Sequence, residues 1–269
     1  MKWALLWILF LWLFIGVSWG QAEEPNWRKS PVPAQAGNFP ETLPCRAQYE
    51  FGWTNIGAAK ADVTFSYSGD HYFFSASGGT YGWARKLWKI DATQISSGFR
   101  GSWLPEKMHQ IERYRSYTMI MDVQYNKLQA DRLRMAIPTP GKPHARKIFP
   151  IKNMRDMLAA MLFVRSQPLR NGDQISQVVF PGDSAFFIQN RVLGRETIDC
   201  GGKPMRTIKF SLSMKKILMD GPQEGSLVAH RKFHSGVIWI SDDNKRIPIR
   251  AEMDIFIGYV YAQLKSVQF

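Results

Sequence analysis

The residues best suited to chemistry in this sequence are a pair of histidines and a pair of adjacent aspartates. His230 and His234 lie four residues apart, so on a strand or on a helix they would share one face and could bind a metal ion. A catalytic zinc ion needs three protein ligands, and no third candidate lies near these two in the sequence. We therefore expect no metal site and interpret the two histidines as a surface pair.

The two aspartates, Asp242 and Asp243, could act as the acid and base of a glycan-cleaving enzyme, with Glu252 as a further carboxylate. Adjacent residues of a strand point to opposite faces, which argues against a shared site unless a turn brings them together. The sequence lacks the Gly-x-Ser-x-Gly, His-Glu-x-x-His and Cys-x-x-Cys motifs and any glycine-rich phosphate loop. We expect a non-catalytic protein without a cofactor, and keep a glycan-acting enzyme as the least favoured alternative.

Aromatic and methionine side chains are the more suggestive candidates for a binding site. Aromatic rings with cations between them could hold glycan rings or lipid head groups, and a methionine face suits a soft apolar ligand. The same residues are more typical of an ordinary core, because aromatic residues favour strands and apolar helical stripes usually pack inward. The candidate ligand-binding residues are Trp53, Tyr72, Phe74, Trp83, Trp88, Met154, Met157 and Met161.

The first twenty residues have the pattern of a secretory signal peptide. Lys2 supplies a positive start, residues 3–17 contain no polar residue, and the small residues Ser18 and Gly20 precede Gln21. The apolar run is just shorter than the roughly 18 residues that suggest a spanning helix, so we expect cleavage, with an uncleaved anchor as the alternative. The sequence thus predicts an exported protein of the periplasm or cell envelope.

The chain is strongly basic, with a formal net charge of +13 and a pI of about 9.8. Such a chain is attracted to anionic surfaces, and for an exported protein these include phospholipid head groups and acidic glycans. We expect no nucleic-acid partner. A basic surface can also serve solubility alone, and charge does not decide between these roles.

The two cysteines, Cys45 and Cys200, could form a disulfide in an exported protein. A bridge that closes so long a loop would stabilise the fold by roughly 3 to 5 kcal/mol in the chain-entropy model. Two unpaired, buried thiols are the alternative, and the spacing does not distinguish them.

The elements that would position these residues are mostly strands. Residues 21–44 contain five prolines and form an extended lead-in, and residues 45–269 form one β-rich domain in which apolar and polar residues alternate between Gly, Asn and Asp turns. Residues 136–150 form a basic, proline-rich loop. One helix is expected at about residues 153–167, capped by Asn153 and ended by Pro168.

The C-terminal part of the chain resembles a known family. Trp239, Asp242, Asp243, Arg246, Pro248 and Gly258 belong to a pattern similar to the C-terminal signature of domain-of-unknown-function family 3108, whose members are exported bacterial proteins. Residues 49–57 and 156–172 are similar to its opening strand and central helix. The resemblance implies a curled antiparallel sheet, or half-barrel, wrapped around one central helix as in periplasmic lipoprotein carriers. It supplies no enzymatic activity that could be transferred to this chain.

The signature residues also have structural roles to fill. Asp242 and Asp243 suit a tight turn, and Pro248 must lie at an edge or bulge of a sheet. Arg246 and Arg250 would share one strand face, where they could pair with Asp242 or Glu252. We therefore interpret the signature as structural in the first place.

Two non-catalytic functions remain open beside the glycan-acting enzyme. A mainly β, exported protein with an aromatic and methionine-rich interior could bind an apolar, lipid-like or glycolipid ligand. Alternatively, its basic loop and lead-in could dock to an envelope protein or to anionic lipid, which would make it a structural or assembly partner.

Overall fold

The computed structural model describes residues 27–28, 37, 43–54, 56–138, 145–229, 235–255 and 258–269. The chain divides into two units, Met1–Ser30 and Pro31–Phe269, and the fold below is that of the second unit. The predicted signal peptide and nearly all of the predicted lead-in lie outside the described residues.

The described part of the chain is mainly β, with one antiparallel sheet of fifteen strands and two short helices, α2 (Gly82–Leu87) and α3 (Met157–Arg165). Neither helix, nor any other in the described residues, is long and apolar enough to cross a membrane. The strands are β1 (Cys45–Trp53), β2 (Ile56–Ser68), β3 (His71–Thr80), β4 (Ile90–Phe99), β5 (Leu104–Tyr114), β6 (Thr118–Tyr125), β7 (Ala130–Ile137), β8 (Ala145–Phe149), β9 (Gln174–Val179), β10 (Phe186–Asp199), β11 (Pro204–Ile217), β12 (Leu227–Ala229), β13 (Gly236–Ser241), β14 (Pro248–Asp254) and β15 (Tyr259–Gln268).

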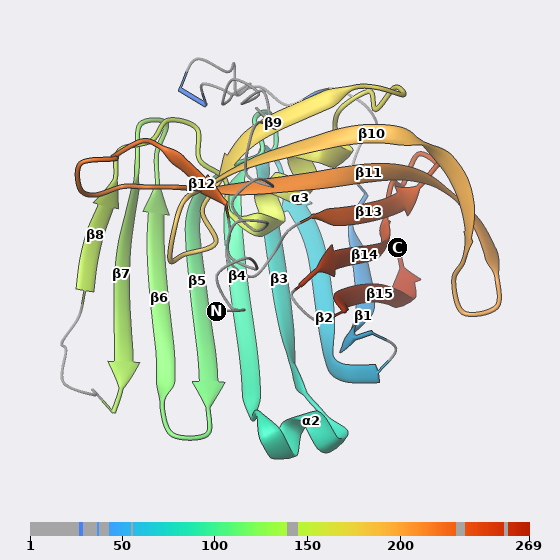
Figure 1. Ribbon diagram of the computed structural model, residues 1–269, viewed down its shortest axis with the longest axis horizontal. Helices are drawn as coiled ribbons and strands as arrows, with labels where there is room; N and C mark the ends of the chain where they lie inside the picture. The colour runs from blue at the N-terminus through green and yellow to red at the C-terminus, as the bar shows by residue number, and fades with distance from the viewer. Residues whose placement is uncertain are drawn as a thin grey trace, which may run out of the picture. The chain divides into compact units, whose positions relative to one another are not determined.

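The sheet runs in the order β8-β7-β6-β5-β4-β3-β2-β1-β15-β14-β13-β11-β10-β9, and β12 pairs with β11 (Figure 1). The first eight strands are a meander of hairpins, as the alternation and turn residues predict. One such turn contains Gly69 at φ 55°, a backbone conformation that glycine adopts without steric penalty. The last strand, β15, pairs with β1, so the C-terminal half of the sheet continues directly from the N-terminal half.

The two ends of the sheet meet through side chains. Phe149 of β8 lies 4.4 Å, ring to ring, from Phe180, which follows β9 at the other end of the sheet. The Tyr125 hydroxyl on β6 donates to the Phe180 carbonyl at 3.1 Å, and Lys147 of β8 forms an ion pair with Asp220, between β11 and β12. The sheet therefore bends until its two edges, at β8 and β9, lie against each other.

Helix α3 fills the space between the two halves of the sheet. Leu162 and Phe163 are fully buried in a cluster with Phe65 and Phe74 of the N-terminal half and Phe210 of the C-terminal half. Each such side chain contributes roughly 1.5–3 kcal/mol when it leaves water. The helix thus holds the two halves together from the inside, at the end of the sheet opposite α2 (Figure 1).

The helix is shorter than predicted, and Asn153 does not cap it. Asn153 has a left-handed φ of 54°, and Asp156 is the cap, whose carboxylate accepts from the backbone N–H groups of Leu158 and Ala159, both at 2.8 Å. The preceding backbone is already paired, because Arg155 exchanges backbone hydrogen bonds with Val178 and Phe180. A tertiary β-bridge therefore delays the helix start that sequence spacing places at residue 153.

The predicted basic loop at residues 136–150 is wrong at both ends, because residues 136–137 belong to β7. Ala145–Phe149 is strand β8, which pairs with β7 and carries the ion pair between Arg146 and Asp131. Residues 139–144 lie outside the described residues. The prolines that suggest a loop lie before and after this strand, so they limit its length without preventing it.

Candidate functional site

The face of β1 to β4 that packs on α3 changes character along the strands. Directly paired residues of antiparallel strands share a face, so Ala61 lies on the same face as Gly78 and Ala92, and four residues from Phe65 of the core. Near α3 this inner face carries large buried rings. Toward α2 it carries small side chains instead.

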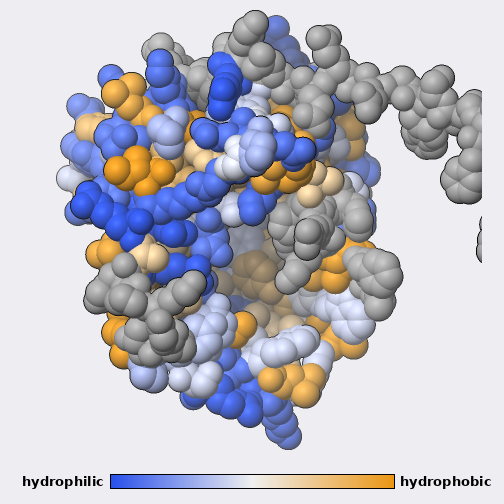
Figure 2. Space-filling view, turned by 60° about the vertical axis from the view of Figure 1, so that its left-hand side comes forward, coloured by the Kyte–Doolittle hydropathy of each residue, from blue (hydrophilic) through white to orange (hydrophobic). Residues whose placement is uncertain are grey.

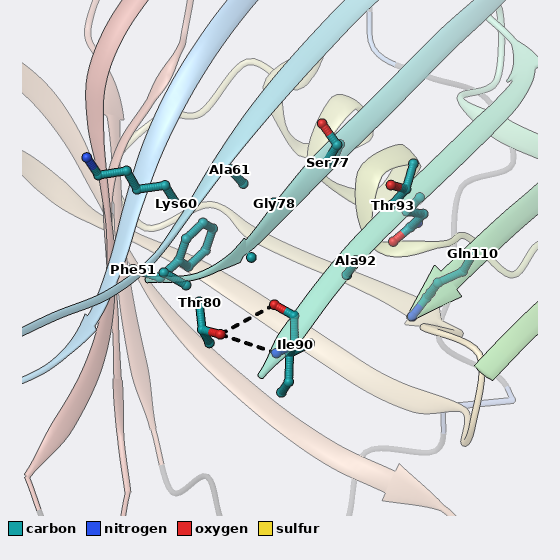
Figure 3. A pocket seen from close by; sticks show the side chains of 14 residues that line it. Phe51, Lys60, Ala61, Ser77, Gly78, Thr80, Ile90, Ala92, Thr93 and Gln110 are labelled. Carbon is teal, nitrogen blue, oxygen red and sulfur yellow. Dashed lines mark hydrogen bonds between the residues drawn. The ribbon is translucent and has the colours of Figure 1, made fainter. Parts of the chain in front are cut away.

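These small residues form the floor of an open cleft of about 340 Å³, here called the inner cleft (Figure 3). Because alanine and glycine leave the inner face shallow, nothing from the described residues fills the space above them. The lining is almost entirely apolar. The main floor and wall residues are Phe51, Ala59, Ala61, Ala76, Gly78 and Ala92. Figure 2 shows that the molecule is hollowed on this view, with hydrophobic residues in the hollow.

Gly78 is required by the close approach of β2 and β3. A Cβ added at Gly78 would lie 2.3 Å from the Lys60 carbonyl oxygen, closer than any real contact. A larger residue would push the two strands apart and deform the floor of the inner cleft.

A second apolar cleft of about 360 Å³, here called the mouth cleft, adjoins the first. Phe51 lines both clefts and is 39% exposed, so it separates them without closing either. Trp53 of β1 and Trp88, the residue after α2, form part of its wall, with Met253 and Val260 from β14 and β15. Together the clefts make an apolar surface that crosses strands from both halves of the sheet.

The polar groups at the rim attach α2 to the ends of β3 and β4. The Thr80 hydroxyl donates to the Trp88 carbonyl at 2.7 Å and accepts from the Ile90 N–H at 3.2 Å. Arg85 forms a two-pronged pair with Asp91 at 2.7 and 2.9 Å, which holds the pKa of that carboxyl below its usual range. These bonds fix the position of the tryptophan beside the mouth cleft.

The predicted ligand-binding residues do not form a single site. Tyr72, Phe74 and Met154 are buried in the interior, and Met161 packs against the α3 cluster. Met157 and Trp83 are 49% and 43% exposed on the surface. Only Trp53 and Trp88 share a cleft, and neither cleft contains Met154, Met157 or Met161.

The inner cleft was missed because its signal is an absence of bulk. Ala59 and Ala61 on β2, Ala76 and Gly78 on β3, and Ala92 on β4 alternate with other residues, so the strand period itself puts the small ones on one face. The sequence-based prediction relied on aromatic rings instead, and these divide between the core, as Tyr72 and Phe74 do, and the exposed surface.

Of the two signature aspartates, Asp243 stabilises the turn as expected. Asp243 accepts from the Ser241 hydroxyl and from the backbone N–H groups of Lys245 and Arg246, at 2.7 to 3.0 Å. Asp242 forms ion pairs with Arg206 at 2.8 Å and Arg195 at 3.6 Å. The two carboxylates thus have different structural partners.

The remaining signature residues differ in how far they follow expectation. Arg250 pairs with Glu252 at 2.6 Å, as expected. Arg246 lies in the turn before β14, so its expected place on a strand face is wrong. It is buried and donates to the carbonyls of Arg165 and Pro168. Pro248 pairs with Ile240 at a bulge, as expected. A Cβ on Gly258, at φ 74°, would lie 2.7 Å from the Thr54 hydroxyl oxygen.

Trp239 and the cysteines are also structural in their contacts. Trp239 is buried, and its indole N–H donates to Glu196 at 2.5 Å. Cys45 and Cys200 are free thiols that pack against the same small apolar cluster. Burial raises the pKa of both thiols, so both remain protonated at neutral pH.

Within the described residues, no three His, Cys, Asp or Glu side chains gather as metal ligands would. His230 and His234 lie outside the part of the chain that the structure describes.

Comparison with known proteins gives a family and a fold. The family model described as "Protein of unknown function (DUF3108)" matches residues 46–265. A comparison with curated protein sequences gave no match.

Among solved structures, the chain resembles a β-barrel-like protein of domain of unknown function DUF1849 from Brucella abortus. The TM-score is 0.53 at 10% identity, with 85% of this chain and 98% of that chain covered. Two further structures are described as an exported protein with a YmcC-like fold from Bacteroides fragilis (TM-score 0.38, 10% identity, 87% and 100% covered) and a lipoprotein from Parabacteroides distasonis (0.33, 8%, 88% and 100%). At this identity the likeness to the Brucella protein supports the fold alone.

Proposed function

The chain belongs to the DUF3108 family, and for this member we propose an exported, non-catalytic role in which the inner cleft binds an apolar or lipid-like ligand. The observation that carries the proposal is the floor of small residues on an otherwise well-packed inner face. A concave, apolar surface of this size falls within the usual range of ligand pockets, roughly 300–1,000 Å³.

The shape of the apolar surface favours an extended ligand. The inner cleft and the mouth cleft meet at Phe51, and their linings come from β14 and β15 on one side and β2 to β4 on the other. An acyl chain could lie across both clefts and remove their apolar surface from water, at roughly 25 cal/mol for each Å² buried. Polar side chains of the lining, Gln94 and Gln110, could orient a polar end of the ligand.

The curled sheet around one helix is also the arrangement that the family resemblance implies, similar to periplasmic lipoprotein carriers. In this protein α3 fills only one end of the inner face, so the opposite end stays open for a ligand. Export rests on the N-terminal sequence, where Lys2, the apolar residues 3–17 and Gly20 match a signal peptide.

The first test is native mass spectrometry of the protein released gently from its own cell envelope. We expect a co-purifying mass that organic extraction removes and that fragments as a lipid. A clean unliganded mass would count against the proposal, and binding of a fluorescent fatty acid to the extracted protein would then decide it.

Variants that fill the cleft locate the binding. Ala61→Leu with Ala92→Leu places two branched side chains on the floor, and we expect affinity for the fluorescent fatty acid to fall about tenfold or more. Ser66→Leu is the matched control, because Ser66 lies on β2 but points to the opposite face. Equal affinities in all three proteins would contradict a site in the inner cleft.

A further inference from the structure

Large apolar side chains gather on the surface at α2, outside the floor of either cleft. Trp83, Leu87 and Trp88 are 43%, 63% and 65% exposed. Trp53 and Ile56, which are paired across the β1–β2 turn, are also exposed, and Trp53 shares the mouth cleft with Trp88. We call these five residues the α2 surface. Contiguous exposed apolar residues of this kind mark interaction sites.

The α2 surface is held in place by buried and hydrogen-bonded groups beneath it. Ala84, on the inward face of the helix, is buried, and the backbone N–H of Trp88 donates to the Ala84 carbonyl at 2.7 Å. Arg85 donates to the Thr80 carbonyl at 3.1 Å in addition to its pair with Asp91. The exposed rings are therefore displayed on an ordered support, and little further ordering is needed when they bind.

The rim of the α2 surface is basic. Two acids lie beside α2. Three cations stabilise the charge of Asp91: Arg85, which binds it directly, and Lys89 and Arg113. The second acid, Glu50, lies against the hydroxyl of Tyr81, the residue that precedes the helix. Arg115, from the β5–β6 turn, donates to the Lys86 carbonyl at 2.7 Å. Arg115 and Lys86 are therefore two further cations at the helix. The five cations outnumber these two acids.

We propose that the α2 surface docks onto the anionic face of a lipid bilayer, with Trp83, Leu87 and Trp88 inserted at head-group depth and the surrounding lysines and arginines on the lipid phosphates. Tryptophan is well suited to this depth, because its ring is apolar and its N–H is polar. Each cation near an anionic membrane adds to the attraction, and the two terms combine in interfacial binding.

The α2 surface adjoins the mouth cleft. Trp88 belongs both to the α2 surface and to the wall of the mouth cleft. A bilayer in contact with α2 would therefore lie against the open end of the apolar clefts. The docking proposal itself does not depend on a ligand in those clefts, because Trp83, Leu87 and Lys86 line neither of them.

The test is sedimentation of the purified protein with vesicles, once with phosphatidylcholine alone and once with phosphatidylglycerol added. We expect binding to the anionic vesicles only, and a fall as salt rises, because the Debye length is about 10 Å at 0.1 M and shorter above it. Trp83→Ser with Leu87→Ser should lower binding about tenfold or more. Lys86→Glu with Lys89→Glu should lower it by a similar factor.

Leu128→Ser with Ile148→Ser is the matched control. Both residues are exposed apolar side chains away from α2, Leu128 in the turn before β7 and Ile148 on β8. Equal loss in the control and in the α2 variant would overturn the proposal. Failure of the protein to sediment with either type of vesicle would also overturn it. In that case, a crosslink between α2 and an envelope protein would assign the surface to a protein partner. Fatty-acid binding should stay unchanged in Trp83→Ser with Leu87→Ser. A loss of vesicle binding in this variant can therefore be distinguished from a loss of ligand binding in the clefts.

Discussion

The guanidinium of Arg246 donates a hydrogen bond to the Pro168 carbonyl oxygen at 3.0 Å, across 78 residues of chain. The same side chain donates to the carbonyls of Arg165 and Gln167. The C-terminal signature therefore holds the end of α3 through buried backbone acceptors. This contact joins the two segments that carry much of the family resemblance.

Replacing Arg246 should be one of the most destabilising single changes in the signature. Arg246→Ala leaves buried carbonyl groups without a charged donor, so we expect the free energy of unfolding to fall by about 3 kcal/mol in urea titrations. Arg250→Ala is the control, because Arg250 makes a partly exposed ion pair with Glu252 and should cost less than about 1 kcal/mol. Similar losses in both variants would show that the contacts of Arg246 contribute nothing special.

Asp156 should make stability depend on pH. Burial raises the pKa of Asp156 above its usual 3.8, although Ser96 and two backbone N–H groups bind the carboxylate. Since the folded state then binds a proton more tightly than the unfolded state, this group's contribution is fully present at low pH. It is lost as the pH rises from about 4 through the folded-state pKa. The wild type should therefore lose stability over this window relative to Asp156→Asn.

The measurement is urea unfolding of wild type and Asp156→Asn at a series of pH values from about 4 to 8. The asparagine oxygen can still accept from Leu158 and Ala159, so the helix cap is retained. A stability difference between the two proteins that does not change with pH would contradict the raised pKa. Asp156→Ala, which removes the cap, should be less stable than Asp156→Asn by about 1–2 kcal/mol at every pH, because neither variant titrates at this position.

A larger side chain should be tolerated in the inner cleft but should destabilise the packed core. Ala92 lines the cleft and Ala159 is fully buried in α3. We expect Ala92→Leu to change the free energy of unfolding by less than about 0.5 kcal/mol and Ala159→Leu to lower it by roughly 1–3 kcal/mol. Equal losses in urea titrations would mean that the space above Ala92 is not open.

The two cysteines should behave as protected thiols. Because burial raises the pKa of Cys45 and Cys200, the native protein should react slowly with iodoacetamide near neutral pH and faster as the pH rises. In urea without reductant, intact mass spectrometry should show both thiols alkylated. An unreactive unfolded protein, lighter by two hydrogens, would indicate a disulfide instead.

Local pattern was enough to predict much of this fold. Alternation of apolar and polar residues, as in Tyr49, Phe51 and Trp53 against Glu50 and Gly52, reports the two faces of a strand directly, because the side-chain period of a strand is two. The turn at Asp243 was likewise predictable, since an aspartate bonds to backbone groups only two or three residues away. The family signature lies in these same local features.

The site depended on contacts that no local pattern contains. Met154 and Tyr72 are buried while Met157 is exposed, because α3 is oriented by partners from β2, β3, β10 and β11 that lie far away in sequence. The inner cleft exists because strand register places Ala61, Gly78 and Ala92 side by side on the face that α3 does not cover. Composition and spacing establish which residues are small or apolar, but pairing between distant strands decides which of them enclose space and which fill it.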